Sequence, residues 1–92
     1  MSLQFEWDEK KARTNKRKHG ISFEEAATAF GDTLSLTIDD PLHSEVESRQ
    51  ILIGLSQRHN VLIVVHIETH QSIRIISARK ATKHEQRMYE EF

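Results

Sequence analysis

The chain has 92 residues and no cysteine, and its 13 Lys and Arg against 14 Asp and Glu give a formal net charge of −1. This length predicts one domain, and the lack of cysteine excludes both a disulfide framework and a thiolate metal site. The sequence has neither an apolar run of about 20 residues nor an apolar leader, so we expect a cytoplasmic protein that does not enter a membrane.

The charges are separated along the chain. Residues 1–20 carry six basic and three acidic side chains, whereas residues 21–50 carry seven acidic side chains and one basic. Residues 51–92 return to six basic and four acidic. A mixed solvated surface is the simplest interpretation, but the separation also suits one face for a polyanion and another for a basic partner.

The first elements expected are a short strand and a charged helix. The aromatic segment 5–7 is typical of an edge strand. A helix is predicted over 9–19, because Asp8 can act as its N-cap and Gly20 can adopt the left-handed conformation that follows a helix end.

A second helix follows at once. Ser22 and Glu25 have the spacing of a capping box, in which each side chain satisfies a free backbone N–H of the other. The apolar residues then recur at helical spacing and predict one buried stripe. They are Phe23, Ala26, Ala27 and Phe30.

The rest of the chain predicts four strands and a final helix. Apolar and polar residues alternate over 34–39, which is typical of a half-buried strand, and Pro41 lies in the loop that follows. A hairpin turn is expected at 57–60, with Asn60 suited to a positive φ. Thr82 and Glu85 form a second capping box, which opens the last helix. The other three strands are predicted over 47–56, 61–67 and 72–78.

This order, β-α-α-β-β-β-β-α, predicts an α+β fold. Short connections between consecutive strands favour an antiparallel sheet, and the helix pair is expected to pack on one face of it.

The six histidines suggest a metal site, but their spacing along the chain argues against one. His66, Glu68 and His70 alternate along an extended segment, so the two histidines would lie about 13 Å apart. A zinc ion holds its ligand atoms at about 2.0–2.2 Å, and one extended strand cannot close such a site. No Gly-x-Ser-x-Gly turn or phosphate-binding glycine loop is present either.

A third option is metal-free acid/base chemistry on a phosphodiester, such as cleavage of RNA through its own 2′-hydroxyl, although the residues alone do not specify it. That reaction needs a base, an acid and fixed positive charge for the phosphorane. The predicted strands carry suitable groups, although Arg74 could equally form a structural ion pair with Glu47 or Glu68, and His66 could be a buried core histidine. The groups are Glu47, Arg49, His66, Arg74 and Arg79.

Three segments together resemble the BrnT family of type II toxins. They are "FEWDEKKARTNKRKHGISFEEAATAF", "DPLHSEVESRQILIGLS" and "LIVVHIETHQSIRIISARKATKHEQRMYEEF". The resemblance covers nearly the whole chain, so residues 1–92 are expected to form a single BrnT-like domain. It implies a RelE-like fold and a ribonuclease that arrests translation without a metal or other cofactor.

The resemblance also implies partners. It points to neutralisation by a BrnA-like antitoxin that carries a ribbon-helix-helix DNA-binding region, in a complex that represses its own operon. Operator DNA would be contacted only through the antitoxin, and a homodimer or a 2:2 complex is possible.

The family's polar positions fall here on Lys18, His19, Glu47, Arg49, Arg74 and Arg79. Arg74 and Arg79 are expected to bind the scissile phosphate, and Lys18 and Arg49 to position the RNA backbone. Glu47, His19 or His66 is the expected base, and the choice among them stays open.

The alternative is a catalytically degenerate toxin that acts as a corepressor module. Residues 78–92 are commonly richer in arginine in relatives, whereas this chain has His84, Gln86, Glu90 and Glu91 there. Nucleic-acid affinity depends largely on basic contacts, so the near-neutral total charge predicts weak long-range attraction to RNA, and the last helix could instead be an antitoxin or dimer surface.

Overall fold

The computed structural model describes residues 3–41 and 48–91. Its elements follow in the predicted order, with one 3-10 helix, η1, added after the second helix. The bounds are β1 (Phe5–Glu6), α1 (Glu9–His19), α2 (Phe23–Thr28), η1 (Ala29–Gly31), β2 (Leu36–Asp39), β3 (Arg49–Leu55), β4 (Val61–Glu68), β5 (Ile73–Lys80) and α3 (Lys83–Glu91). The α+β fold is therefore confirmed. No helix in the described part of the chain is long and apolar enough to cross a membrane.

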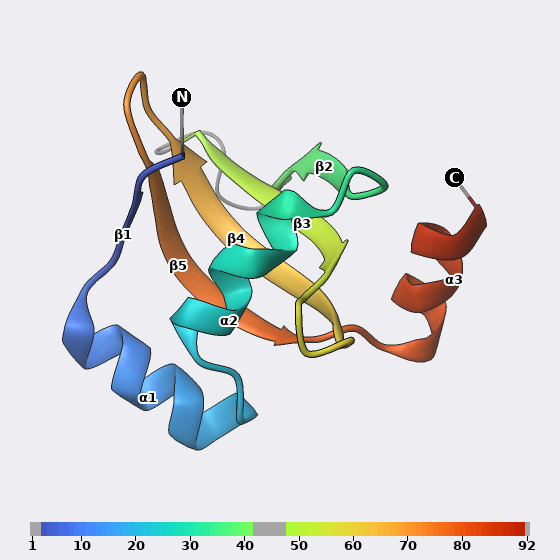
Figure 1. Ribbon diagram of the computed structural model, residues 1–92, viewed down its shortest axis with the longest axis horizontal. Coiled ribbons are helices and arrows are strands. Elements are labelled where there is room, and N and C mark those ends of the chain that lie inside the picture. The colour runs from blue at the N-terminus through green and yellow to red at the C-terminus, as the bar shows by residue number, and fades with distance from the viewer. Residues whose placement is uncertain (1–2, 42–47, 92) are drawn as a thin grey trace.

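The five strands form one sheet in the order β1-β5-β4-β3-β2 (Figure 1). Strands β2 to β5 pair antiparallel with their neighbours, as the short connections predict. Strand β1 pairs parallel to β5, with Phe5 opposite Ile73 and Glu6 opposite Arg74, so the sheet is mixed. Short connections do not constrain β1, because β1 lies at the edge beside β5, the last strand, rather than beside β2, the strand that follows it in the chain.

The ends of α1 agree with the prediction. The Asp8 carboxylate accepts hydrogen bonds from the backbone N–H groups of Lys10 and Lys11 at 2.8 and 3.1 Å. Gly20 has φ 76°, and its N–H donates to the carbonyl of Lys16. A side chain at this φ is strained, so glycine suits the end of this helix.

The capping box of α2 is only half formed. Ser22 Oγ accepts the Glu25 N–H at 3.0 Å, but the Glu25 carboxylate turns inward and accepts from Ser56 Oγ at 2.7 Å and from Asn60 Nδ2 at 2.8 Å. The prediction that Glu25 returns to Ser22 is therefore wrong, because Glu25 instead holds the β3–β4 turn. In that turn His59, not Asn60, has the positive φ, 65°.

The core lies between the helices and one face of the sheet, which we call the helix face. In Figure 1, α2 crosses the front of the sheet and α1 runs beside β5. The predicted stripe on α2 is confirmed, since Phe23 and Ala26 are fully buried, and Ala27 and Phe30 are half-buried. The cluster comprises Ile21, Phe23, Ala26, Ala29, Leu52, Leu62, Val64, Ile75 and Ala78.

Strand β2 is shorter than predicted. It begins at Leu36, and Leu34 lies in a turn where its N–H donates to the Asp32 carboxylate at 3.0 Å. Leu34 is 67% exposed, and Ile38 in β2 is 45% exposed. The alternation that predicted a strand from residue 34 therefore includes a turn residue.

Asn15 joins α1 to the edge of the sheet. Its Nδ2 donates to the carbonyl oxygens of Ala78 at 2.8 Å and Ile21 at 3.0 Å, and its Oδ1 accepts the Ala78 N–H at 3.1 Å. Asn15 is only 7% exposed. One side chain thus binds the edge of β5 and the corner between α1 and α2.

We expect Asn15→Ala to lower the free energy of unfolding by about 3 kcal/mol, because it leaves buried backbone groups without partners. Urea unfolding measures this change, with the neighbouring exposed Thr14→Ala as the control, expected to change stability by less than about 0.5 kcal/mol. Equal stability of the two variants would contradict this role of Asn15.

Candidate functional site

The face of the sheet opposite the helices, which we call the second face, carries two arginines in one row. Arg49 of β3 is opposite Ile67 of β4, which in turn is opposite Arg74 of β5. Neighbouring strands lie about 4.8 Å apart, so the Cα atoms of Arg49 and Arg74 are about 10 Å apart. Arg74 is exposed and Ile67 is half-buried. A guanidinium group binds phosphate oxygens through paired hydrogen bonds, so this row can hold a phosphodiester.

The predicted structural ion pair of Arg74 with Glu68 does not form. Glu68 is the register partner of Ile73, and within residues 3–41 and 48–91 no carboxylate makes an ion pair with Arg74. The other predicted partner, Glu47, lies outside the residues that the structure describes.

A β-bulge places Arg74 and Arg79 on the same face. The register of β4 and β5 shifts between Val65 and His66, which leaves Ile76 as the extra residue of β5. Residues five apart lie on opposite faces of a regular strand, so without the bulge Arg74 and Arg79 would point apart. Even so, their Cα atoms are separated by about 15 Å along the strand.

Arg79 is bound to the last helix. Its Nη1 and Nη2 donate to the two carboxylate oxygens of Glu85, both at 2.8 Å. Hydrogen bonds from Arg79 lower the pKa of Glu85 to about 2, and the same bonds raise the pKa of Arg79 above its ordinary value. The second anchor of α3 is Tyr89, whose hydroxyl donates to Asp32 at 2.5 Å. Arg79 thus holds α3, which lies to the right of the sheet in Figure 1, whereas α1 lies at its lower left.

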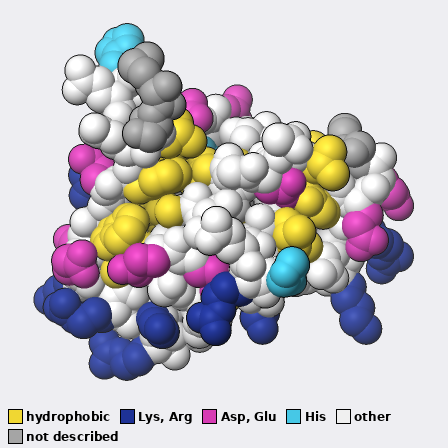
Figure 2. Space-filling model, viewed as in Figure 1, with side chains coloured by type: hydrophobic (Ala, Val, Ile, Leu, Met, Phe, Trp, Pro, Cys, Tyr) yellow, Lys and Arg dark blue, Asp and Glu magenta, His cyan; other side chains and the backbone are white. Residues whose placement is uncertain are grey.

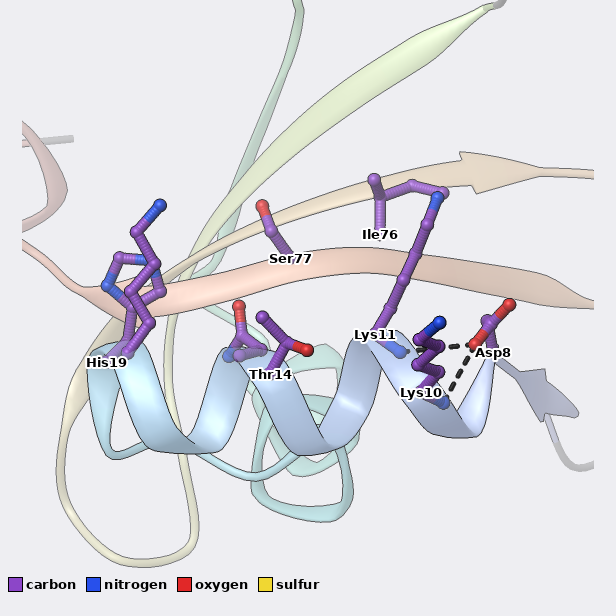
Figure 3. A pocket seen from close by; sticks show the side chains of 9 residues that line it. Asp8, Lys10, Lys11, Thr14, His19, Ile76 and Ser77 are labelled. Atoms are coloured by element: carbon purple, nitrogen blue, oxygen red, sulfur yellow. Dashed lines mark hydrogen bonds between the residues drawn. The ribbon is translucent and has the colours of Figure 1, made fainter.

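Lys18 and His19 lie at a groove between α1 and β5. The groove has a volume of about 430 Å³. In Figure 3, Lys11 reaches from α1 towards Ile76 of β5, and Thr14 and Ser77 lie on opposite walls. The full lining is Asp8, Lys10, Lys11, Thr14, Asn15, Lys18, His19, Ile76 and Ser77.

The groove lies next to the arginine row. Backbone hydrogen bonds from Lys11 and Lys10 hold the pKa of Asp8 below its ordinary value, and the positive charges of Lys11 and Arg74 lower it further. Arg74 lies beside this end of the groove, because its register partner is Glu6, two residues before Asp8, and it precedes the lining residue Ile76 by two residues. The structure thus brings Arg49 and Arg74 together, adds Lys18 and His19 through the groove, and leaves Arg79 paired with α3.

His66 is on the wrong face to meet Arg49 and Arg74. It is opposite Ile75, is fully buried, and packs edge-on against Phe30 with ring centroids 4.8 Å apart. Its Nδ1 lies 3.2 Å from the carbonyl oxygen of Val64, and its Nε2 has no partner among the described residues. Burial lowers the pKa of His66. The interpretation of His66 as a core histidine therefore holds.

The described residues contain no group of three His, Asp or Glu placed to hold a metal ion. The groove residues Lys11, Thr14 and Ser77 were missed by sequence reasoning. A signal existed for Lys11 and Thr14, because positions seven and four before Lys18 share its face of a helix. No signal existed for Ser77, whose place depends on the bulge.

This fold and this site define a small RelE-like α+β protein with a cationic sheet face beside a basic helix. A family model described as "Ribonuclease toxin, BrnT, of type II toxin-antitoxin system" matches residues 7–85. The chain therefore belongs to the BrnT family of ribonuclease toxins, and membership of a type II system implies an antitoxin partner.

The chain is also similar to a solved structure, that of the ribonuclease toxin BrnT of Brucella abortus. The two agree with a TM-score of 0.68, over 89% of this chain and 100% of that chain. Their sequences are 21% identical, so this likeness shows the fold alone. No curated protein matches the chain.

The Arg79–Glu85 pair generates a pH-dependent prediction. The pKa of Glu85 falls from 4.5 to about 2 on folding, so its stabilisation is complete above about pH 4.5 and is lost as the pH falls towards 2. Because the Arg79 side chain is 41% exposed, solvent screens the pair, and we expect Glu85→Gln to cost only about 1 kcal/mol at pH 7.

Urea unfolding of Glu85→Gln at about pH 7 and about pH 3 measures this effect, and the difference from the unmutated chain should shrink at the lower pH. Glu90→Gln, on the exposed side of the same helix, is the control and should change stability little at either pH. A difference that stays constant with pH would show that the Glu85 carboxylate does not stabilise α3.

Proposed function

We propose that this chain is an endoribonuclease toxin that cuts RNA by metal-independent acid/base chemistry and thereby inhibits translation. The observation that carries the proposal is the row of Arg49, Ile67 and Arg74 on the second face. Two arginines whose Cα atoms are about 10 Å apart can hold one phosphodiester from both sides, because each side chain reaches inward by several ångströms. Family membership supports the reaction class.

In this proposal a base removes the proton of the RNA 2′-hydroxyl, and the 2′-oxygen attacks the neighbouring phosphorus. The bond from phosphorus to the 5′-oxygen breaks, and an acid gives a proton to that oxygen. The products are a 2′,3′-cyclic phosphate and a free 5′-hydroxyl. Arg49 and Arg74 stabilise the negative charge that builds up on the phosphorane oxygens.

Two candidates remain for the base. Glu47 is a candidate on its sequence spacing from Arg49 alone, because it lies outside the residues that the structure describes. His19 is the other candidate, but it lies at the end of the groove away from Arg74, about 16 Å along α1 from Asp8, and this distance from the row disfavours it. We give His66 no part in proton transfer because it is buried on the helix face. Arg79 is assigned to holding α3 through Glu85 rather than to binding phosphate.

We expect Arg74→Ala and Arg49→Ala each to reduce RNA cleavage by the purified chain about 100-fold or more, because each removes a donor to the developing charge. Arg58→Ala, an exposed arginine in the β3–β4 turn, is the matched control and should cleave at the unmutated rate. All reactions are run with and without EDTA.

Full activity of Arg74→Ala would contradict the role of the row. Cleavage that disappears with EDTA would contradict the metal-independent mechanism. Absence of cleavage by every variant, together with normal growth of cells that express the chain, would instead favour the corepressor function.

For the partner we propose a BrnA-like antitoxin with a ribbon-helix-helix region, which contacts operator DNA and forms a 2:2 complex with this chain in the cytoplasm. The acidic segment between residues 21 and 50 supports a basic contact surface on that partner. Co-purification of the two proteins, followed by a gel shift on the upstream DNA, tests this. A shift produced by this chain without the antitoxin would contradict it.

A further inference from the structure

The groove between α1 and β5 has the properties of a binding site for a polyanion. Lys11 and Lys18 are seven residues apart, which places them on one side of α1 and about 10 Å apart along its axis. Thr14 and Ser77 add hydroxyl groups between them, and Ile76 adds an apolar surface. Lysine side chains at this spacing can also contact two phosphates of one strand, so the groove suits a chain of phosphates.

The charge balance of the groove is positive. Three lysines line it against one carboxylate, that of Asp8. Asp8 is already engaged as the N-cap, since it accepts hydrogen bonds from two backbone N–H groups of α1. The positive end of the helix dipole therefore stabilises the negative charge of Asp8. The Asn15 amide is likewise engaged with Ala78 and Ile21.

The groove also has a direction. Its Asp8 and Lys11 end lies next to Arg74, whose register partner is Glu6, and its other end is at Lys18 and His19. A strand whose scissile phosphate lies between Arg49 and Arg74 can therefore continue past the edge of β5 into the groove. Figure 2 shows further Lys and Arg side chains gathered over α1 at the lower edge of the molecule, and these surround the groove with positive potential.

We propose that this groove binds the sugar-phosphate backbone of unpaired RNA next to the cleavage site, with Lys11 and Lys18 on successive phosphates and Thr14 and Ser77 donating to their oxygens. The proposal rests on the function proposed above and specifies its substrate as single-stranded RNA. Thr14 and Ser77 lie on opposite walls of the groove and Ile76 adds an apolar surface, so one sugar-phosphate backbone with unpaired bases fits between α1 and β5.

The test compares two double variants of equal charge. Lys11→Ala with Lys18→Ala removes two charges from the groove side of α1, and Arg13→Ala with Arg17→Ala removes two from the outward side. Alanine favours a helix, so both variants should fold like the unmutated chain, and melting curves check this. The probe is a single-stranded RNA of about 12 nucleotides with 2′-O-methyl groups, which can bind but cannot be cleaved.

We expect the groove variant to bind this probe about 20-fold more weakly at about 0.1 M salt, and its salt slope to fall by about 1.4, since each phosphate contact in a single strand contributes about 0.7. The outward variant should keep the unmutated slope. An equal loss of affinity for the probe in the two variants would overturn the proposal, because it would show that the RNA responds only to net charge. Unchanged affinity in the groove variant would overturn it as well.

A duplex of the same sequence tests the substrate class, and binding of the duplex as tightly as the single strand would overturn it. Cleavage of the unmodified RNA by the unmutated chain tests the proposed function separately. Cleavage with identical behaviour of the two double variants would refute the groove and leave the ribonuclease standing. If the groove variant alone lost affinity for the probe and the unmutated chain cleaved no RNA, the groove would be supported and the ribonuclease function refuted.

Discussion

The Asn15 side chain occupies the place of a neighbouring strand beside Ala78, and the arrangement of the functional surface depends on this contact. Strand β1 pairs with only the first two residues of β5, so the edge of β5 beyond Arg74 needs another partner for its backbone groups. Asn15 supplies a donor and an acceptor to Ala78 and a further donor to Ile21. Because Asn15 is on α1, the same contact sets the distance between that helix and the sheet, and thus the width of the groove.

The bulge at Ile76 is the second constraint. It brings Arg74 and Arg79 to one face, where the two side chains have different surroundings. Arg74 remains exposed in a row with Arg49, while Arg79 is neutralised by Glu85 and holds α3 in place. Arg79 thus attaches the last helix, and Arg74 is left for the proposed contact with phosphate.

Much of this fold follows from local patterns. The caps at Asp8 and Gly20 and the box at Thr82 depend only on neighbouring residues, so they were predicted correctly. Glu25 was not, because its carboxylate is drawn to Ser56 and Asn60 about 30 residues away in sequence. The isoleucine-rich sequence of β5 contains no pattern that predicts the bulge. The sequence therefore suggests residue types for a candidate site, whereas their grouping depends on long-range contacts and register. Glu47 lies outside the described residues.

The central claim is that one strand of RNA follows a single path from the arginine row, across the edge of β5 and into the groove of α1. Backbone amide chemical shifts, recorded while the uncleavable single strand is added, test this most directly. The account predicts changes along β5, on the groove side of α1 and around Arg49 in β3, and little change in α2 or β2. Changes centred on α2 or β2, or on the outward side of α1 alone, would contradict it.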